Sequence, residues 1–86
     1  MFAILFTKKT YKQYDGLPKR ERLRIDAVVT GLRENPFAGK KLDGDLEGYW
    51  GIRSWPYRVI YTIEKYLVTV TVVAIGQRKD VYRKLK

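Results

Sequence analysis

The sequence predicts an α+β domain in which a hairpin of two helices packs on one face of a small, mainly antiparallel sheet. The chain has 86 residues, the size of one domain, so residues 1–86 are treated as a single unit. Residues 8–34 place apolar side chains at helical spacing, whereas residues 49–75 are rich in β-branched and aromatic residues. With one apolar strand at residues 2–6, the expected order of elements is β-α-α-β-β-β.

The first half of the chain is predicted to form one strand and two helices. Residues 2–6 are a continuous apolar run, typical of a strand buried on both faces. Thr7 can cap the helix that follows, and Asp15-Gly16 separates this helix from a second one that ends at Asn35-Pro36. The second helix carries an apolar stripe at the i, i+3, i+4, i+7 spacing, made of Ile25, Val28, Val29 and Leu32.

The second half is predicted to be a three-stranded meander that follows a loop at residues 37–48, which are Gly-rich and polar. The strands are expected at residues 49–53, 57–63 and 67–75, with Gly76 ending the last one and a short basic tail, helical or irregular, after it. Alternation in the last strand gives an apolar face for the helices to cover, made of Val68, Val70, Val72 and Ala74. The opposite face of the sheet is expected to be free, and a function is expected to lie there.

Composition excludes several classes of function. The chain has 18 Lys and Arg against 9 Asp and Glu, a net charge of +9, which indicates a polyanionic or acidic partner. It has no histidine and no cysteine, so Ser-His triads, thiol catalysis, disulfides and thiolate metal sites are excluded. No apolar run approaches the roughly 18–20 residues of a membrane span, and the N-terminus lacks the order of a signal peptide. We therefore expect a soluble, cytoplasmic protein with no membrane partner.

Arg58 is the charged residue whose position is most informative. It lies inside an otherwise apolar strand, so its guanidinium must reach solvent, a partner charge or a ligand. Alternation places Arg58 on the face of Ile60, opposite Val59, and this is the free face if Val59 faces the helices. Ordinary pairing with Glu64 or another carboxylate is the alternative.

Four segments of the chain resemble the RelE/ParE superfamily of bacterial and archaeal toxins, which are the toxin halves of type II toxin–antitoxin pairs. The segments are residues 36–42, 46–53, 57–61 and 75–82. The strand Tyr57-Arg58-Val59-Ile60-Tyr61 and the Ile-Gly-x-Arg-x-x-x-Tyr pattern that ends at Tyr82 are fairly specific together. Members of the RelE branch are similar to one another in cutting mRNA on the ribosome, whereas ParE relatives keep the fold and poison DNA gyrase.

The resemblance implies a set of site residues. Those expected to be catalytic match basic positions of the family and its C-terminal tyrosine: Arg53, Arg58, Arg78 and Tyr82. Independently of the resemblance, the positive charge of the loop and of the tail favours RNA binding by Lys40, Lys41, Lys79, Arg83 and Lys84. The chain departs from the family pattern at Gly51, where many RelE-type sequences have Lys or Arg, and at Gln77, where many have His.

RNA cleavage by attack of a 2′-hydroxyl on the adjacent phosphate suits these residue types. The reaction requires no metal, no cofactor and no protein nucleophile, but it requires in-line geometry, cations for the phosphorane and groups that move protons. Converging arginines supply the cations, and Tyr82 is the candidate for proton transfer because arginine hardly titrates. The aromatic residues that are candidates for stacking on bases, if they do not simply fill the core, are Trp50, Trp55, Tyr57 and Tyr61.

Three functions remain open from the sequence. A ribosome-dependent mRNA endoribonuclease ranks first, a ParE-like gyrase inhibitor second, and a catalytically weak RNA-binding relative third. The expected partners are mRNA and the ribosome, together with an acidic, partly disordered antitoxin that folds on the basic surface. The toxin and antitoxin are expected to form a hetero-oligomer.

Overall fold

The structure is a computed structural model that describes residues 1–83 and 85, with the backbone alone of Arg78 and Lys79. Its elements in chain order are β1 (Ala3–Phe6), α1 (Lys8–Asp15), α2 (Lys19–Glu34), β2 (Lys40–Lys41), β3 (Trp50–Ser54), β4 (Tyr57–Glu64), β5 (Thr69–Gln77) and α3 (Arg78–Arg83). Two 3₁₀ turns, Pro36–Ala38 and Gly44–Leu46, flank β2. None of the described helices is long and apolar enough to cross a membrane.

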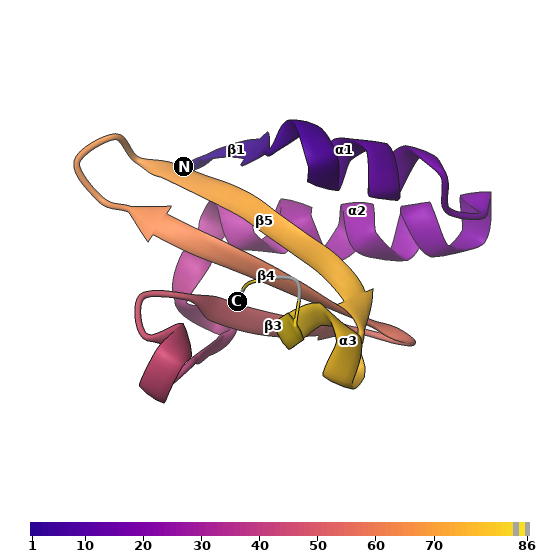
Figure 1. Ribbon diagram of the computed structural model, residues 1–86. Helices are drawn as coiled ribbons and strands as arrows, with labels where there is room; N and C mark the ends of the chain where they lie inside the picture. The colour runs from indigo at the N-terminus through magenta and orange to yellow at the C-terminus, as the bar shows by residue number, and fades with distance from the viewer. Residues whose placement is uncertain (84, 86) are drawn as a thin grey trace.

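The strands form one mixed sheet with α1 and α2 on one face (Figure 1). Its strand order is β1-β5-β4-β3-β2, in which β1 runs parallel to β5 and every other neighbouring pair is antiparallel. The two central strands, β5 and β4, carry most of the buried residues. This arrangement confirms the expected α+β class and the helical hairpin on a mainly antiparallel sheet.

Local sequence signals explain the two long helices. The side chain of Thr7 caps α1 by accepting a hydrogen bond from the backbone N–H of Thr10 at 3.2 Å. Helix α2 buries Ile25, Val29 and Leu32, which are three of the four residues predicted for its inner stripe. Val28 is half-buried at the edge of that stripe.

An irregularity in β5 changes which residues face the helices. Ile60 pairs with Ala74 but Tyr61 pairs with Val72, so Val73 is an extra residue, as in a β-bulge. Val72 packs under the helices as predicted, whereas Ala74 points to the opposite face and Ile75 takes the place under the helices. The predicted alternation therefore fails at Ala74, and it also fails at Val68, which lies in the turn before β5 and is exposed. The expectation that Gly76 ends the strand is also wrong, because β5 continues to Gln77.

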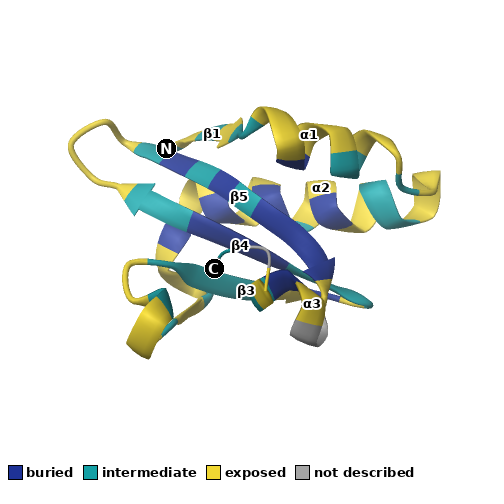
Figure 2. Ribbon diagram, in the orientation of Figure 1, coloured by how far each residue is buried: buried dark blue, intermediate teal, exposed yellow. Residues whose placement is uncertain are grey.

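The second face of the sheet is partly covered, so the prediction that it is free is wrong. Helix α3 packs there, and its Val81 is fully buried together with Ile60 and Ala74. Figure 2 shows that most of β5 is buried, whereas β1 has exposed residues such as Leu5, so the prediction that this strand is buried on both faces is wrong. The segment was predicted only as a basic tail, and the apolar contacts of Val81 that hold α3 on the sheet were not predicted.

Residues 37–48 are more ordered than the predicted connecting loop, because β2 pairs with β3 within this segment. Tyr61 holds the segment in place: its hydroxyl donates to the carbonyl of Pro36 at 2.7 Å and accepts from the N–H of Gly39 at 3.2 Å. A Cβ at position 39 would lie 2.7 Å from the carbonyl oxygen of Gly51 and would also clash with the Tyr61 hydroxyl. Glycine is therefore required at position 39.

Candidate active site

Two arginines face each other across β3 and β4. Arg53 pairs directly with Arg58, and residues directly opposite in neighbouring strands point to the same face. This is the α3 face, because Arg58 and Ile60 are two residues apart on β4. Like charges in this position repel, and no described carboxylate lies within ion-pair distance of either guanidinium. The pair therefore presents a strong positive potential without an internal counter-ion among the described residues.

The described partner of Arg58 is a tyrosine of α3. The Arg58 Nη1 donates a hydrogen bond to the Tyr82 hydroxyl at 2.8 Å, and both side chains are half-buried. The packing of Val81 against Ile60 fixes α3 on the sheet and so positions this hydroxyl. Glu64, the carboxylate weighed as a partner, lies at the other end of β4, where it pairs with Thr69. Six residues of strand, roughly 20 Å, separate it from Arg58.

The two predicted lysines of β2 lie on different faces of the sheet. Lys40 pairs with Gly51, which shares the α3 face with Arg53, so Lys40 is at the rim of the site. Lys41 pairs with Trp50, which lies on the face of α1 and α2. Both lysines are exposed, and the structure brings only Lys40 to the face of the arginine pair.

The remaining predicted residues come from the end of the chain. Arg78 is the first residue of α3, two residues after Gly76, which pairs with Arg58. The side chains of Arg78 and Lys79 lie outside the described part of the structure, as does Lys84. Arg83 is exposed at the end of α3.

A pocket of about 170 Å³ lies beside the arginine pair, and its lining residues are Arg53, Trp55, Pro56, Tyr57 and Arg58. Trp55 is 72% exposed at the β3–β4 turn. The sequence singled out Trp55 as one of four aromatic candidates, and the expected strands place it in the turn between Arg53 and Arg58, but the pocket was not expected. The pocket therefore adds an aromatic wall to the cationic site.

The other aromatic candidates have structural roles. Tyr61 is fully buried, and Trp50 stacks on it with ring centroids 6.4 Å apart, so the prediction that these rings can stack on bases is wrong for Tyr61 and unsupported for Trp50. The Tyr57 hydroxyl donates to Glu21 of α2 at 2.8 Å. This hydrogen bond raises the pKa of Tyr57 above its ordinary value, because the neutral phenol is the donor, and partial burial adds to the effect.

The two departures from the family pattern have different surroundings. A Cβ at Gly51 would point to the α3 face, 3.3 Å from Ile60 Cδ1 and 3.6 Å from Leu42 Cδ2. Its neighbours are thus the ends of side chains, and neither backbone nor Trp55 packs over it. Gln77 pairs with Tyr57 and therefore lies on the face opposite Arg58. A histidine at position 77 would therefore not point toward Arg58.

The described site can bind an anion and hold a proton donor beside it. Two guanidinium groups provide planar donors for phosphate oxygens. The oxygen of the Tyr82 hydroxyl accepts the hydrogen bond from Arg58, so the hydroxyl proton is available to another acceptor.

Comparisons with known proteins identify the family of this chain. A family model described as "ParE toxin of type II toxin-antitoxin system, parDE" matches residues 4–82. Toxin RelG of Mycobacterium tuberculosis is 28% identical over 85 residues, which cover 96% of this chain and 98% of RelG.

Solved structures share the fold. The toxin–antitoxin complex RelBE2 from Mycobacterium tuberculosis contains a chain similar to this one, with a TM-score of 0.82 and 25% identity over 90% of this chain and 98% of that chain. The isolated Escherichia coli RelE toxin matches with a TM-score of 0.78 and 24% identity over 99% of this chain and 95% of that chain. Because the family model spans nearly the whole sequence, the chain belongs to the ParE toxin family within the RelE/ParE superfamily of type II toxin–antitoxin toxins.

Proposed function

We propose that this toxin is a ribosome-dependent endoribonuclease that cuts mRNA by attack of a 2′-hydroxyl on the adjacent phosphate, without a metal or cofactor. The observation that carries the proposal is the hydrogen bond from Arg58 to Tyr82 directly beside Arg53. It joins a phosphate-binding cation pair to a positioned hydroxyl, which are the groups that this reaction requires.

Each residue has a distinct role in the proposed reaction. Arg53 and Arg58 bind the scissile phosphate and stabilise the additional negative charge of the phosphorane. The P–O2′ bond forms as the proton of the 2′-hydroxyl passes to solvent water, and Tyr82 donates its proton to the departing 5′-oxygen as the P–O5′ bond breaks; water then reprotonates Tyr82. Arg78, assigned from the family resemblance, adds a further cation after β5.

Basic residues around this centre are proposed to bind the RNA backbone. Lys40 at the rim of the site and Arg83 at the end of α3 are exposed, as phosphate binding requires. Lys79 and Lys84 are proposed from the sequence alone. Lys41, on the other face of β2, is the weakest member of the predicted set.

The chain is also proposed to pair with an acidic antitoxin as a hetero-oligomer. RelBE2 from Mycobacterium tuberculosis and RelBE from Escherichia coli are both described as toxin–antitoxin complexes, and their toxin chains share this fold. The net charge of +9 and the arginine pair without a carboxylate partner among the described residues favour an acidic segment as the occupant of this surface.

Inhibition of DNA gyrase is the second candidate function, and the match to a ParE family model favours it. Such an inhibitor acts by binding and has no need for a hydroxyl held against an arginine. The Arg58–Tyr82 pair therefore favours RNA cleavage over gyrase poisoning.

Primer extension on a cellular message after brief induction of the toxin tests the proposal. We expect new 5′ ends inside the codons of a translated message and none on the same message without its start codon. Equal cutting of the untranslated message would contradict ribosome dependence. Intact RNA together with altered DNA supercoiling would overturn the proposal in favour of gyrase.

A further inference from the structure

The β3–β4 turn exposes an aromatic ring beside the cationic site. Trp55 is 72% exposed, although indole is one of the side chains that gain most from burial. The second tryptophan, Trp50, follows the usual pattern, since it is half-buried against the rings of Phe37 and Tyr61. Trp55 instead forms a wall of the pocket that contains Arg53 and Arg58.

The turn that carries Trp55 is anchored at its base. Ser54 and Tyr57 close it as the last pair of the β3–β4 ladder, and the Tyr57 hydroxyl donates to Glu21 of α2 at 2.8 Å. Arg24, also on α2, donates from Nη1 to the Trp55 carbonyl at 3.4 Å. A ring on an anchored turn loses little conformational entropy when a ligand stacks on it.

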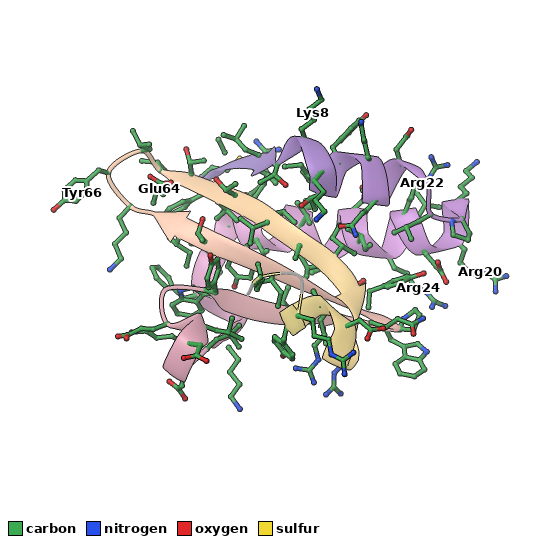
Figure 3. The ribbon with its side chains drawn as sticks, in the orientation of Figure 1. Lys8, Arg20, Arg22, Arg24, Glu64 and Tyr66 are labelled. Atoms are coloured by element: carbon green, nitrogen blue, oxygen red, sulfur yellow. The ribbon has the colours of Figure 1, made fainter. Side chains whose placement is uncertain are left out.

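Positive charge lies on both sides of this ring. Arg53 and Arg58 flank the pocket, and Arg24 contacts the turn from α2. Figure 3 shows Arg20, Arg22 and Arg24 projecting from the N-terminal part of α2. A polyanion that crosses the turn would therefore meet cations before and after Trp55.

The size of the pocket limits what it can hold. Its volume of about 170 Å³ is below the roughly 300–1,000 Å³ of pockets that enclose small molecules. It suits one flat ring system that lies against the indole. Nucleobases of a single strand expose flat faces next to phosphates, whereas the base faces of a duplex are covered by their neighbours.

We propose that Trp55 is a base-stacking subsite for single-stranded RNA, which holds the nucleobase next to the phosphate that Arg53 and Arg58 bind. The inference rests on the proposed function and adds to it a contact that positions the RNA for cleavage. Stacking is tolerant of sequence because every base has a flat face, so this subsite contributes affinity and register more than base identity.

Binding of short single-stranded RNA, made non-cleavable by 2′-O-methyl groups, tests the subsite. Trp55→Ala in the full chain should weaken binding roughly 5-fold or more, the usual effect of removing an aromatic platform, whereas Trp55→Phe should retain most of the affinity. Tyr66→Ala is the matched control, because Tyr66 is fully exposed at the β4–β5 turn. Equal affinities of Trp55→Ala and Tyr66→Ala would overturn the proposal.

A series of RNAs with one abasic position each locates the stacked base. At one position, removal of the base should lower the affinity of the wild type by the same factor as Trp55→Ala lowers it for intact RNA. The two changes together should lower the affinity little more than either change alone. Additive losses at every position would overturn the subsite. If Trp55→Ala unfolds, Trp55→Phe replaces it on the same series and should lose affinity at one abasic position, as the wild type does; the absence of any such position would overturn the subsite. Loss of antitoxin-peptide binding without such coupling to a base would assign the ring to a protein partner and overturn the proposal.

A separate measurement of mRNA cleavage distinguishes failure of the Trp55 subsite from failure of the proposed function. A toxin that cuts translated mRNA but shows no coupling between Trp55 and any base has the proposed function without this subsite. A toxin that shows the coupling but does not cut RNA has the subsite without the proposed chemistry.

Discussion

The two faces of the sheet differ in what they bury. Under α1 and α2 the face is apolar along its length, where Val59, Tyr61 and Val72 are fully buried. Under α3 the face has an apolar cluster around Ile60, and Arg58 lies two residues away on the same strand, where it pairs with Arg53. The first face holds the fold together, whereas the second combines packing and a polar site within one strand. Substitutions on the two faces should therefore affect different properties.

The length of α3 determines which residues of this face are covered by the helix and which form the candidate site. It has six residues, too few for an isolated helix to be stable, so the burial of Val81 on the sheet holds it in place. A helix this short covers Ile60 and Ala74 but leaves the arginine pair accessible. Tyr82, the residue after Val81, then reaches Arg58.

Tyr82→Phe should have the largest effect on activity and none on the fold. The change keeps the ring and removes only the hydroxyl that accepts from Arg58. We expect single-turnover cleavage on programmed ribosomes to fall about 10²–10⁴-fold, as when a general acid is lost, with an unchanged melting temperature. Cleavage at the wild-type rate would show that Tyr82 only packs.

Arg58→Ala should follow, with a loss of about 10²–10³-fold in the same cleavage assay, because one donor to the phosphorane is removed. The half-buried Arg58 lies at the edge of the packed centre, so circular dichroism should show a folded protein. Arg33→Ala is the matched control, since Arg33 is exposed in the last turn of α2 and should be dispensable. Similar losses from both variants would mean that net charge, and not this site, determines the rate.

Tyr61→Phe tests the helix-covered face, where we expect a loss of stability and not of chemistry. It leaves the Pro36 carbonyl and the Gly39 N–H without their partner, at a cost of roughly 1–3 kcal/mol in the free energy of unfolding. Urea unfolding measures this cost, and Tyr66→Phe, at an exposed tyrosine, is the control. A loss of cleavage that exceeds the loss of folded protein would contradict the separation of the two faces.

The stability difference between the wild type and Tyr61→Phe should depend on pH. Burial raises the pKa of Tyr61 above its ordinary value near 10, so the unfolded chain loses this proton at lower pH than the folded chain does. The stability associated with the neutral phenol is present below pH 10 and is lost as the pH rises through the pKa of the folded state. The stability difference between wild type and Tyr61→Phe should therefore narrow above pH 10. A constant difference would contradict this assignment.

Gly51→Lys should have the smallest effect and the opposite sign. The new side chain would start on the α3 face, where Ile60 Cδ1 must shift by a few tenths of an ångström, and would add a cation near Arg53. We expect cleavage to rise about 2- to 10-fold through the stronger local field. A folded variant with no gain in rate would refute the view that a cation is missing, and an unfolded one would show that close packing requires glycine.

Periodic signals made most of the fold predictable. Signals that lie within short segments predicted three features: the cap at Thr7, the inner stripe of α2 and the meander of three strands. Strand β2 was not predicted, because two residues are too few to show an alternation of apolar and polar side chains. They form a strand only by pairing with β3. The irregularity at Val73 and the cover by α3 also depend on contacts between distant residues.

The site was predictable in composition but not in arrangement. The family resemblance pointed to Arg53, Arg58 and Tyr82, and the structure brings these three together. The face on which each β2 lysine lies depends on the unforeseen pairing of that strand. Trp55 lies in the turn expected between the strands of Arg53 and Arg58, whereas the pocket that it forms with them depends on how the side chains pack.

A translated mRNA with one 2′-deoxynucleotide at the mapped cleavage position provides the most direct test of the proposed chemistry. If the 2′-hydroxyl is the nucleophile, the deoxy message should remain intact at that position, while the all-ribose message is cut to a 2′,3′-cyclic phosphate and a 5′-hydroxyl. Cleavage of the deoxy position at the normal rate would show that water or a protein group attacks the phosphate, and would contradict the proposed role of the Arg58–Tyr82 site.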